Sequence, residues 1–263
     1  MGSATRHALA ALKNSVDGWG QAELRDAEQV FAAVNAAGAN QHLLVALSNP
    51  AADVSARREL AGRVFGSHLS PRALQLLQEA VSQTWSSNHE FALGLQELAV
   101  RATAQTAGEQ SAIAAELTTV ADTISANPEL ELTLGSRLGD SAVKSQLVER
   151  LFAGKISAPS LLILRELVGN PLGRRTRRLL TWAGEVVADQ AGRSVATVTV
   201  ASPLAPEQLA KLEAGLTRRF NRRVFVTTVI DPKIIGGLRV QLGDDVIDDS
   251  VAARLNNLRL QLA

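Results

Sequence analysis

Apolar residues recur at three- and four-residue intervals from about residue 3 to residue 190. Phe31, Val34 and Ala37, for example, form the stripe of a helix that buries one face. Short polar breakers interrupt the pattern, and at several of them Asn or Ser precedes proline, a position that disfavours helical dihedral angles. The pattern predicts helices near residues 4–17, 21–37, 41–48, 52–65, 70–86, 88–106, 108–126, 128–136, 140–153, 157–169 and 172–190.

The helical region repeats itself at a constant offset, since Phe65 is followed 87 positions later by Phe152. Charged positions match as well as apolar ones, which argues against chance similarity between unrelated amphipathic helices. The sequence therefore predicts a duplicated unit of four or five helices. We expect a first bundle over residues 1–106 and a second over residues 88–190, with the helix at 88–106 shared. The other matching pairs include Leu47/Leu134, Asp53/Asp140, Leu60/Leu147, Arg63/Arg150, Ser70/Ser157, Leu74/Leu161, Leu77/Leu164, Glu79/Glu166 and Val81/Val168.

The pattern changes after residue 193, where β-branched residues alternate with smaller ones as they do in strands. Gly236 and Gly237 fall inside one predicted strand, where glycine usually marks a bulge or a close approach of backbone. Residues 193–263 are thus predicted to form a small mixed α/β domain that follows a mainly α, tandemly duplicated helical bundle. We expect strands near 194–201, 224–230, 234–242 and 246–247, and helices at 206–220 and at 251–261, the latter capped by Ser250.

The composition excludes several classes of protein. Lys and Arg number 27 against 26 Asp and Glu, and this net charge of +1 argues against a dedicated nucleic-acid or anionic-membrane binder. There are no cysteines, so disulfides and thiolate chemistry are excluded. The sequence has no apolar run of the roughly 20 residues that a membrane span needs, and its start lacks the apolar core of a signal peptide. We therefore expect a cytosolic protein.

No cluster in the sequence predicts catalysis or metal binding. The histidines His7, His42, His68 and His89 are scattered, and none has the spacing of a metal-ligand pair. The aspartates between residues 244 and 249 lack the alternating ligands of a calcium loop. The paired glycines lack the strand-to-helix setting of a phosphate loop. We therefore expect no cofactor, no metal and no enzymatic activity.

Arg174, Arg175, Arg177 and Arg178 form the densest basic cluster of the chain. They fall at the start of the helix predicted at 172–190, with few aromatic residues nearby on which bases could stack. A solvated helix face or a contact with an acidic protein partner is favoured here over nucleic-acid binding.

Residues 195–258 contain a specific combination of motifs. The run V-x-V-A-S-P-L-x-x-E-Q-x-x-x-L is followed by V-I-D-P-x-I-I-G-G-L-x-V-x-L-G-D-x-V-I-D-x-S-V-x-x-R-L, which joins a hairpin, a glycine pair and a capped helix in one order. This stretch resembles the delta subunits of bacterial F-type ATP synthases, which are related to the mitochondrial oligomycin-sensitivity-conferring protein. The resemblance implies that the structural residues of the family motif are Pro232, Gly236, Gly237, Gly243, Asp248 and Ser250.

The resemblance extends upstream, with two departures. Residues 171–192 resemble the last helix of the family's N-terminal domain, and residues 3–12 resemble its first. Asp249 stands where the family commonly has glycine. The chain is also longer than most members by nearly one repeat offset. It resembles the lengthened delta subunits of actinobacteria, some of which are fused to a b-like stalk segment that we do not find in this sequence.

The resemblance implies a non-enzymatic stator subunit at the cytoplasmic face of the cell membrane. In the family, an N-terminal helical bundle holds N-terminal helices of alpha subunits and the C-terminal part is held by b subunits, so that the peripheral stalk resists the torque of the rotor. Helix-in-groove contacts of this kind need apolar stripes rather than reactive groups. Leu9, Leu12 and Val16 are candidate contacts with an alpha-subunit helix, and the same residues would equally serve to pack the bundle. A helical adaptor of another complex is the alternative.

Overall fold

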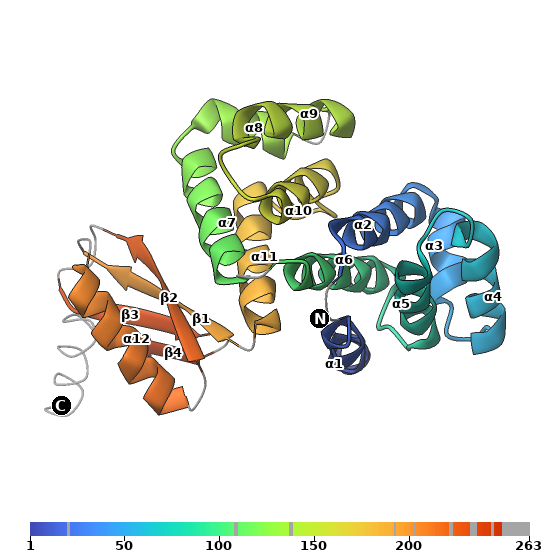
Figure 1. Cartoon of the computed structure of the whole chain (residues 1–263), viewed down its shortest axis with the longest axis horizontal. Helices are drawn as coiled ribbons and strands as arrows, with labels where there is room; N and C mark the ends of the chain where they lie inside the picture. Colours follow the sequence, from blue (N-terminus) through green and yellow to red (C-terminus); the bar gives the residue numbers. More distant parts are fainter. Residues whose placement is uncertain are drawn as a thin grey trace, which may run out of the picture. The chain divides into compact units, whose positions relative to one another are not determined.

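The computed structural model describes residues 1–19, 22–107, 110–136, 139–191, 193–201, 204–220, 223–231, 236–242 and 245–248. The contacts between residues divide the chain into two compact units, Met1–Gln190 and Ala191–Ala263. The described part of the first unit is helical, and that of the second is a sheet with one helix (Figure 1). The predicted fold class, mainly α with a small mixed α/β part at the C-terminal end, is confirmed.

The helices predicted for the first unit all form, and most of their ends are shifted by no more than a few residues. They are α1 (Ser3–Asp17), α2 (Leu24–Ala39), α3 (Gln41–Ser48), α4 (Val54–Phe65), α5 (Pro71–Ser82), α6 (Asn88–Gln105), α7 (Gln110–Ser125), α8 (Pro128–Gly135), α9 (Ser141–Phe152), α10 (Ala158–Gly169) and α11 (Thr176–Gln190).

Two helix ends were predicted wrongly. Helix α5 stops at Ser82 rather than at residue 86, and the buried Trp85 beyond it donates its indole N–H to the carbonyl of Ala80 at 2.9 Å. Helix α11 begins at Thr176 rather than at residue 172. Leu172 and Gly173 have φ angles of 46° and 81°, and a right-handed helix excludes this left-handed backbone. Arg174 and Arg175 therefore precede the helix.

Helices α3, α4 and α5 recur as α8, α9 and α10, and each bound is shifted by 87 residues. The caps recur with the helices. Asn40 Oδ1 accepts from the backbone N–H of Leu43 at 3.1 Å, and Asn127 Oδ1 accepts from that of Leu130 at 3.3 Å. Asn and Ser caps satisfy N–H groups that have no partner within the helix, so they fix where each helix begins.

A long-range contact recurs in the same way. The backbone N–H of Ser70 donates to Gln29 Oε1 at 2.6 Å, and that of Ser157 donates to Glu116 Oε2 at 3.1 Å. Gln29 and Glu116 are again 87 positions apart in the sequence. The start of α5 is thus tied to α2 as the start of α10 is tied to α7.

Helix α6 lies at the middle of the helical unit (Figure 1). Of its 18 residues 13 are buried, and they include the polar Gln96, Glu97 and Arg101. The helix packs against α1, α2 and α3 and also against α7, α10 and α11. Buried apolar residues from Ala8 to Val187 form one continuous core around it.

The second unit contains β1 (Arg193–Val200), α12 (Pro206–Phe220), β2 (Arg223–Ile230), β3 (Leu238–Leu242) and β4 (Asp245–Asp248). The strand order is β2-β1-β3-β4, and β1 pairs with β2 in parallel and with β3 antiparallel. Helix α12 connects the two parallel strands, because a tight turn cannot join strands that run in the same direction. Among the described residues of this unit, the buried apolar ones are Ala196, Val198, Val200, Leu216, Val224, Val226 and Val240.

The glycine pair lies outside the strand that was predicted around it. Strand β3 begins at Leu238, and Gly236 and Gly237 form a bend before it, with a φ angle of 82° at Gly237. Because glycine adopts positive φ without steric cost, the pair marks a turn into the strand rather than a bulge within it. The predicted helix at 251–261, its cap Ser250, and the motif residues Pro232 and Gly243 lie outside the described residues.

Candidate partner-binding site

The candidate contact residues on α1 are buried in the helical unit. Leu9, Leu12 and Val16 have exposed fractions of 8%, 1% and 0%, and all three belong to the apolar core. Packing of the bundle, one of their two expected roles, accounts for this burial. A contact between these residues and an alpha-subunit helix stays a prediction, because it requires this face of α1 to become accessible.

The described motif residues of the second unit lie at ends of strands. Gly236 and Gly237 precede β3, and Asp248 is the last residue of β4. Asp248 stands opposite Arg239 in the antiparallel register of β3 and β4.

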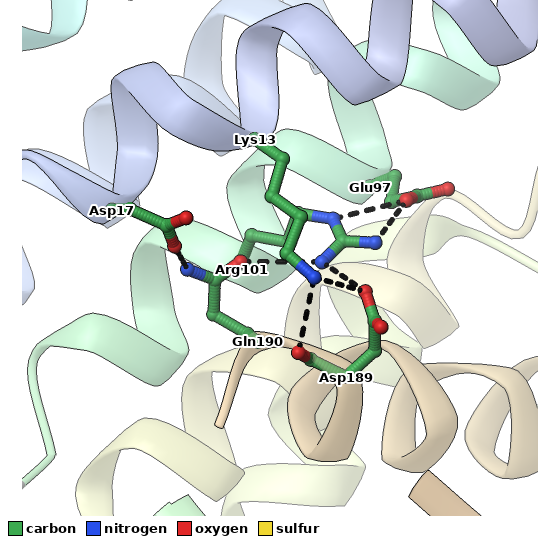
Figure 2. A network of polar contacts seen from close by, with 6 residues as sticks. All are labelled: Lys13, Asp17, Glu97, Arg101, Asp189 and Gln190. Atoms are coloured by element: carbon green, nitrogen blue, oxygen red, sulfur yellow. Dashed lines mark hydrogen bonds and ion pairs between the residues drawn. The ribbon is translucent and has the colours of Figure 1, made fainter. Parts of the chain in front are cut away.

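A polar network joins α1, α6 and α11, and it extends from the buried Arg101 and Glu97 to Asp189, whose side chain is 54% exposed (Figure 2). At its centre Arg101, which is 7% exposed, donates to Glu97 Oε1 through Nε at 3.0 Å and through Nη2 at 2.7 Å. Its Nη1 donates to Asp189 Oδ2 at 2.8 Å and to Gln190 Oε1 at 3.2 Å. The guanidinium of α6 therefore has partners on its own helix and on α11.

Helix α1 enters the same network through Lys13 and Asp17. Lys13 Nζ donates to Asp189 Oδ2 at 2.8 Å and to the carbonyl of Asp189 at 3.1 Å, while Gln190 donates to Asp17 (Figure 2). Two cations, Lys13 and Arg101, thus share one carboxylate. A charge can remain in the interior only when it is paired and hydrogen-bonded, and the buried Arg101 and Glu97 meet both conditions.

The pKa values of the network agree with this geometry. Burial alone would lower the pKa of Arg101, but the contacts with Glu97 and then Asp189 outweigh it and raise that pKa above its usual value. Burial would raise the pKa of Asp189, but hydrogen bonds from Lys13 and Arg101 bring it below the usual range. Both groups are therefore charged at neutral pH.

A second polar network joins α2, α6 and α10. Asn35 donates to Glu166 Oε2 at 2.9 Å and accepts from Asn170 Nδ2 at 2.9 Å. Gln96 on α6 donates to the carbonyl of Asn170 at 2.7 Å and accepts from Arg174. Helix α6 is therefore held by polar contacts at two places, in addition to its apolar packing.

The arginine cluster divides into one packed residue and three exposed ones. The Arg174 guanidinium lies 4.0 Å from the ring centroid of Trp182, and burial lowers its pKa to about 10, an effect that Glu97 partly opposes. Arg175, Arg177 and Arg178 are exposed. Stacking on an aromatic ring accounts for the position of Arg174, and the other three remain available at the surface.

Only one feature of the sequence points to either network. Glu97 and Arg101 are an i, i+4 pair within a helix whose neighbouring residues are almost all apolar. An exposed pair at this spacing is common, so the pattern alone does not show that both side chains are buried. Whether Glu97 and Arg101 are buried depends on which helices pack against α6.

Other kinds of site are not seen in the described part of the chain. Its His, Asp and Glu residues form no group of three that could hold a metal ion. No single described helix has the length and apolar composition of a membrane span, and only α2 and α3 together, bent by 110°, meet those two criteria.

The structure thus defines a helical protein whose helices are linked by polar networks and are followed by a small α/β unit. Comparisons with known proteins identify the family that has these features. The family model of the ATP synthase delta (OSCP) subunit matches residues 98–262. The ATP synthase subunit delta of Leifsonia xyli subsp. xyli is 42% identical over 264 residues, with 100% of both chains covered. That of Streptomyces avermitilis is 34% identical over 267 residues, which covers 99% of this chain and 98% of the relative. The chain belongs to the ATP synthase delta (OSCP) subunit family.

Among solved structures, a chain of the Toxoplasma gondii mitochondrial ATP synthase hexamer matches with a TM-score of 0.43 and 19% identity, over 64% of this chain and 94% of that one.

The family model begins at residue 98, inside α6, so it covers α7 to α11 and the second unit but not α1 to α5. The expected equivalence between residues 3–12 and the family's first helix is not the alignment that this model gives.

Proposed function

We propose that the chain is a non-enzymatic stator subunit of the rotary ATP synthase. In this role it links the catalytic head of alpha and beta subunits to the b-subunit peripheral stalk, at the cytoplasmic face of the cell membrane. The match of the family model to residues 98–262 carries the proposal, and it is supported by relatives of the same length that are named ATP synthase subunit delta. The division into a helical unit and a separate α/β unit suits a protein that binds two different partners.

We further propose that the helical unit consists of two related bundles, residues 1–106 and 88–190, which share α6. The recurrence of α3, α4 and α5 as α8, α9 and α10 supports this division, as do the repeated caps and the repeated contacts of Ser70 and Ser157. Because the family model starts within α6, the second bundle is the one that corresponds to the family's N-terminal domain. The first bundle is then the added copy.

The experiment that tests the stator role is cross-linking and mass spectrometry of the ATP synthase purified through a tag on this chain. We expect the chain to copurify with alpha, beta and b subunits. Cross-links from residues 1–190 should reach alpha subunits, and those from residues 191–263 should reach b. Purification with a different set of proteins, without alpha and beta, would instead support a helical adaptor of another complex.

A further inference from the structure

A large groove opens beside α8, at the start of α9 and at the connection from α10 to α11. Its volume is about 1340 Å³, and its lining includes both apolar and charged side chains. Leu132 of α8 is 75% exposed, more than any other large apolar side chain that the structure describes. Pro128, Pro171 and Leu172 add further apolar surface to the lining. Together these residues give the groove an apolar side, on which the apolar face of a partner helix can pack.

The charge of the groove is predominantly positive. Lys144, Arg174 and Arg175 line it, and Glu131 is the one acidic residue of the lining that the structure describes. Lys144 is only 7% exposed, and its ammonium group donates to the carbonyl of Ser136. Among the described residues no carboxylate lies within ion-pair distance of Lys144. Lys144 therefore adds a positive charge to the groove that no described carboxylate neutralises.

The positive charge continues onto α11, where it does not stabilise the helix. Arg177 and Arg178 lie in the first turn of α11, and this turn contains no acidic residue. The N-terminal end of a helix has a partial positive charge, so cations there are unfavourable. Arg175, Arg177 and Arg178 are exposed, and the described residues supply no ion-pair partner for them. Helix stability therefore does not explain these arginines, whereas an external acidic group would.

The corresponding positions in α3 and in the segment after α5 are better covered by the chain itself. Val45, which matches Leu132 at the 87-residue offset, is 39% exposed, and Leu44, which matches Glu131, is buried. Trp85, which matches Leu172, is also buried and packs edge-on against Phe91. The combination of an uncovered leucine with surplus positive charge is thus a feature of α8 to α11.

We infer that this groove binds an acidic, amphipathic segment of another ATP synthase subunit, with apolar side chains of the segment on Leu132 and carboxylates beside Arg175, Arg177 and Arg178. This inference rests on the proposed function. The occupant is defined by its chemistry: an apolar stripe fits the leucine and prolines, and negative charge complements the surplus cations.

The test is site-specific photo-cross-linking in the assembled ATP synthase. Benzoylphenylalanine is placed at Leu132, the complex is purified, and the cross-linked peptide is identified by mass spectrometry. We expect a net negative peptide of another subunit with an apolar face. The matched control is the same photo-cross-linker at Val45, where we expect at least tenfold less of that product. The charge variant Arg175→Glu/Arg177→Glu/Arg178→Glu should lower the yield at position 132 by about tenfold, through loss of three surface ion pairs.

The variant Arg6→Glu/Arg25→Glu/Arg58→Glu changes the net charge equally at other exposed arginines, and it should leave the yield unchanged. If the chain assembles with alpha and beta but position 132 cross-links to no other subunit, or to a basic segment, the groove inference is wrong and the stator function stands. An equal loss of yield in both charge variants also overturns it. If the chain does not assemble with alpha and beta at all, the proposed function fails, and this inference fails with it.

Discussion

Arg101 places a full positive charge in the interior between α1, α6 and α11. Its partner Glu97 is itself only 7% exposed, so neither charge can be returned to water without a change of structure. Removing one member of a buried ion pair leaves the other charge unpaired, and this costs more than the pair contributes. The stability of the helical unit should therefore depend strongly on this one side chain.

We expect Arg101→Met to lower the free energy of unfolding by about 3 kcal/mol, because it leaves Glu97 buried and removes a partner of Asp189. Denaturant unfolding followed by circular dichroism measures this. The double variant Arg101→Met/Glu97→Gln should recover part of the loss, since it removes the unpaired charge. A single variant as stable as the wild type would show that the network is open to water.

Gly94 of α6 lies against the ring of Trp85. A Cβ atom at position 94 would come within 2.1 Å of that ring, and the ring is buried and held by its hydrogen bond to Ala80. We expect Gly94→Ala to destabilise the protein by about 1–3 kcal/mol, although alanine favours helices. Gly215→Ala is the matched control, because a Cβ at this helical position meets nothing within 4 Å. It should stabilise by about 0.5–1 kcal/mol, and thermal unfolding distinguishes the two signs.

Leu12→Ser tests the contact predicted for α1. If the alpha N-terminus binds at α1 rather than in the second bundle, a peptide that copies it should bind this variant more weakly by about 1–2 kcal/mol. Because Leu12 is buried, the same change should also lower stability by roughly 2–5 kcal/mol, so binding is measured on protein shown to be folded. Normal binding by folded Leu12→Ser, with loss of binding on disrupting Leu147, would place the site in the second bundle.

At the scale of elements, the hydrogen bond from Ser157 to Glu116 shows how one copy differs from the other. Glu116 takes the place of Gln29, and it accepts from both the hydroxyl of Ser157, at 2.6 Å, and its backbone N–H. Burial would raise the pKa of Glu116, but the hydrogen bonds from Ser157 and Ser160 lower it below its usual value. The hydrogen bonding between α7 and α10 through Glu116 therefore depends on pH, whereas the hydrogen bond between Ser70 and Gln29 does not.

A lowered pKa in the folded state means that the folded protein binds this proton less readily than the unfolded chain. Glu116 therefore contributes stability above the ordinary carboxyl pKa, near 4.3, and the contribution is lost as pH falls through the lower folded-state pKa. We expect the melting temperature of Glu116→Gln to fall less steeply than that of the wild type below about pH 4. Glu185, whose pKa is raised by burial, acts in the opposite direction, so Glu185→Gln should not reproduce this effect. Parallel pH profiles for Glu116→Gln and wild type would contradict the prediction.

The helices could be predicted from sequence because most of their signals are local. Ser70-Pro71 and Asn127-Pro128 combine a cap with a proline that fits the first turn, and both helices begin there. The start of α11 could not be predicted, since nothing in the sequence requires left-handed backbone at Leu172. The networks of Arg101 and Asn35 depend on packing between helices far apart in the sequence. The groove was also missed, although its arginines were recognised as a candidate contact with an acidic partner.

At the scale of the whole molecule, the helical unit has one core although its elements recur. The buried apolar residues from Ala8 to Val187 form a single cluster that passes through α6. Elements that share a continuous core usually open together, whereas separately packed elements open independently. The second unit has its own smaller core, built from β1, β2, β3 and α12.

We therefore expect the helical unit to unfold cooperatively. Hydrogen exchange measured by mass spectrometry should give the same highest opening free energy for α2, α6 and α7 within about 1 kcal/mol. The second unit should exchange with a separate value. If α7 to α10 opened well before α1 to α5, the two proposed bundles would be independent domains that happen to be adjacent.

Helix α6 has a consequence for any attempt to shorten or lengthen this chain. Helix α6 packs on helices from both halves. A truncation on either side of it therefore leaves one half without its central helix and exposes apolar surface. An insertion of one full 87-residue period would instead add five helices and leave α1 and α11 as the end caps. In this respect the region behaves like a solenoid protein, in which each repeat is stable only beside its neighbours and the length changes by whole repeats.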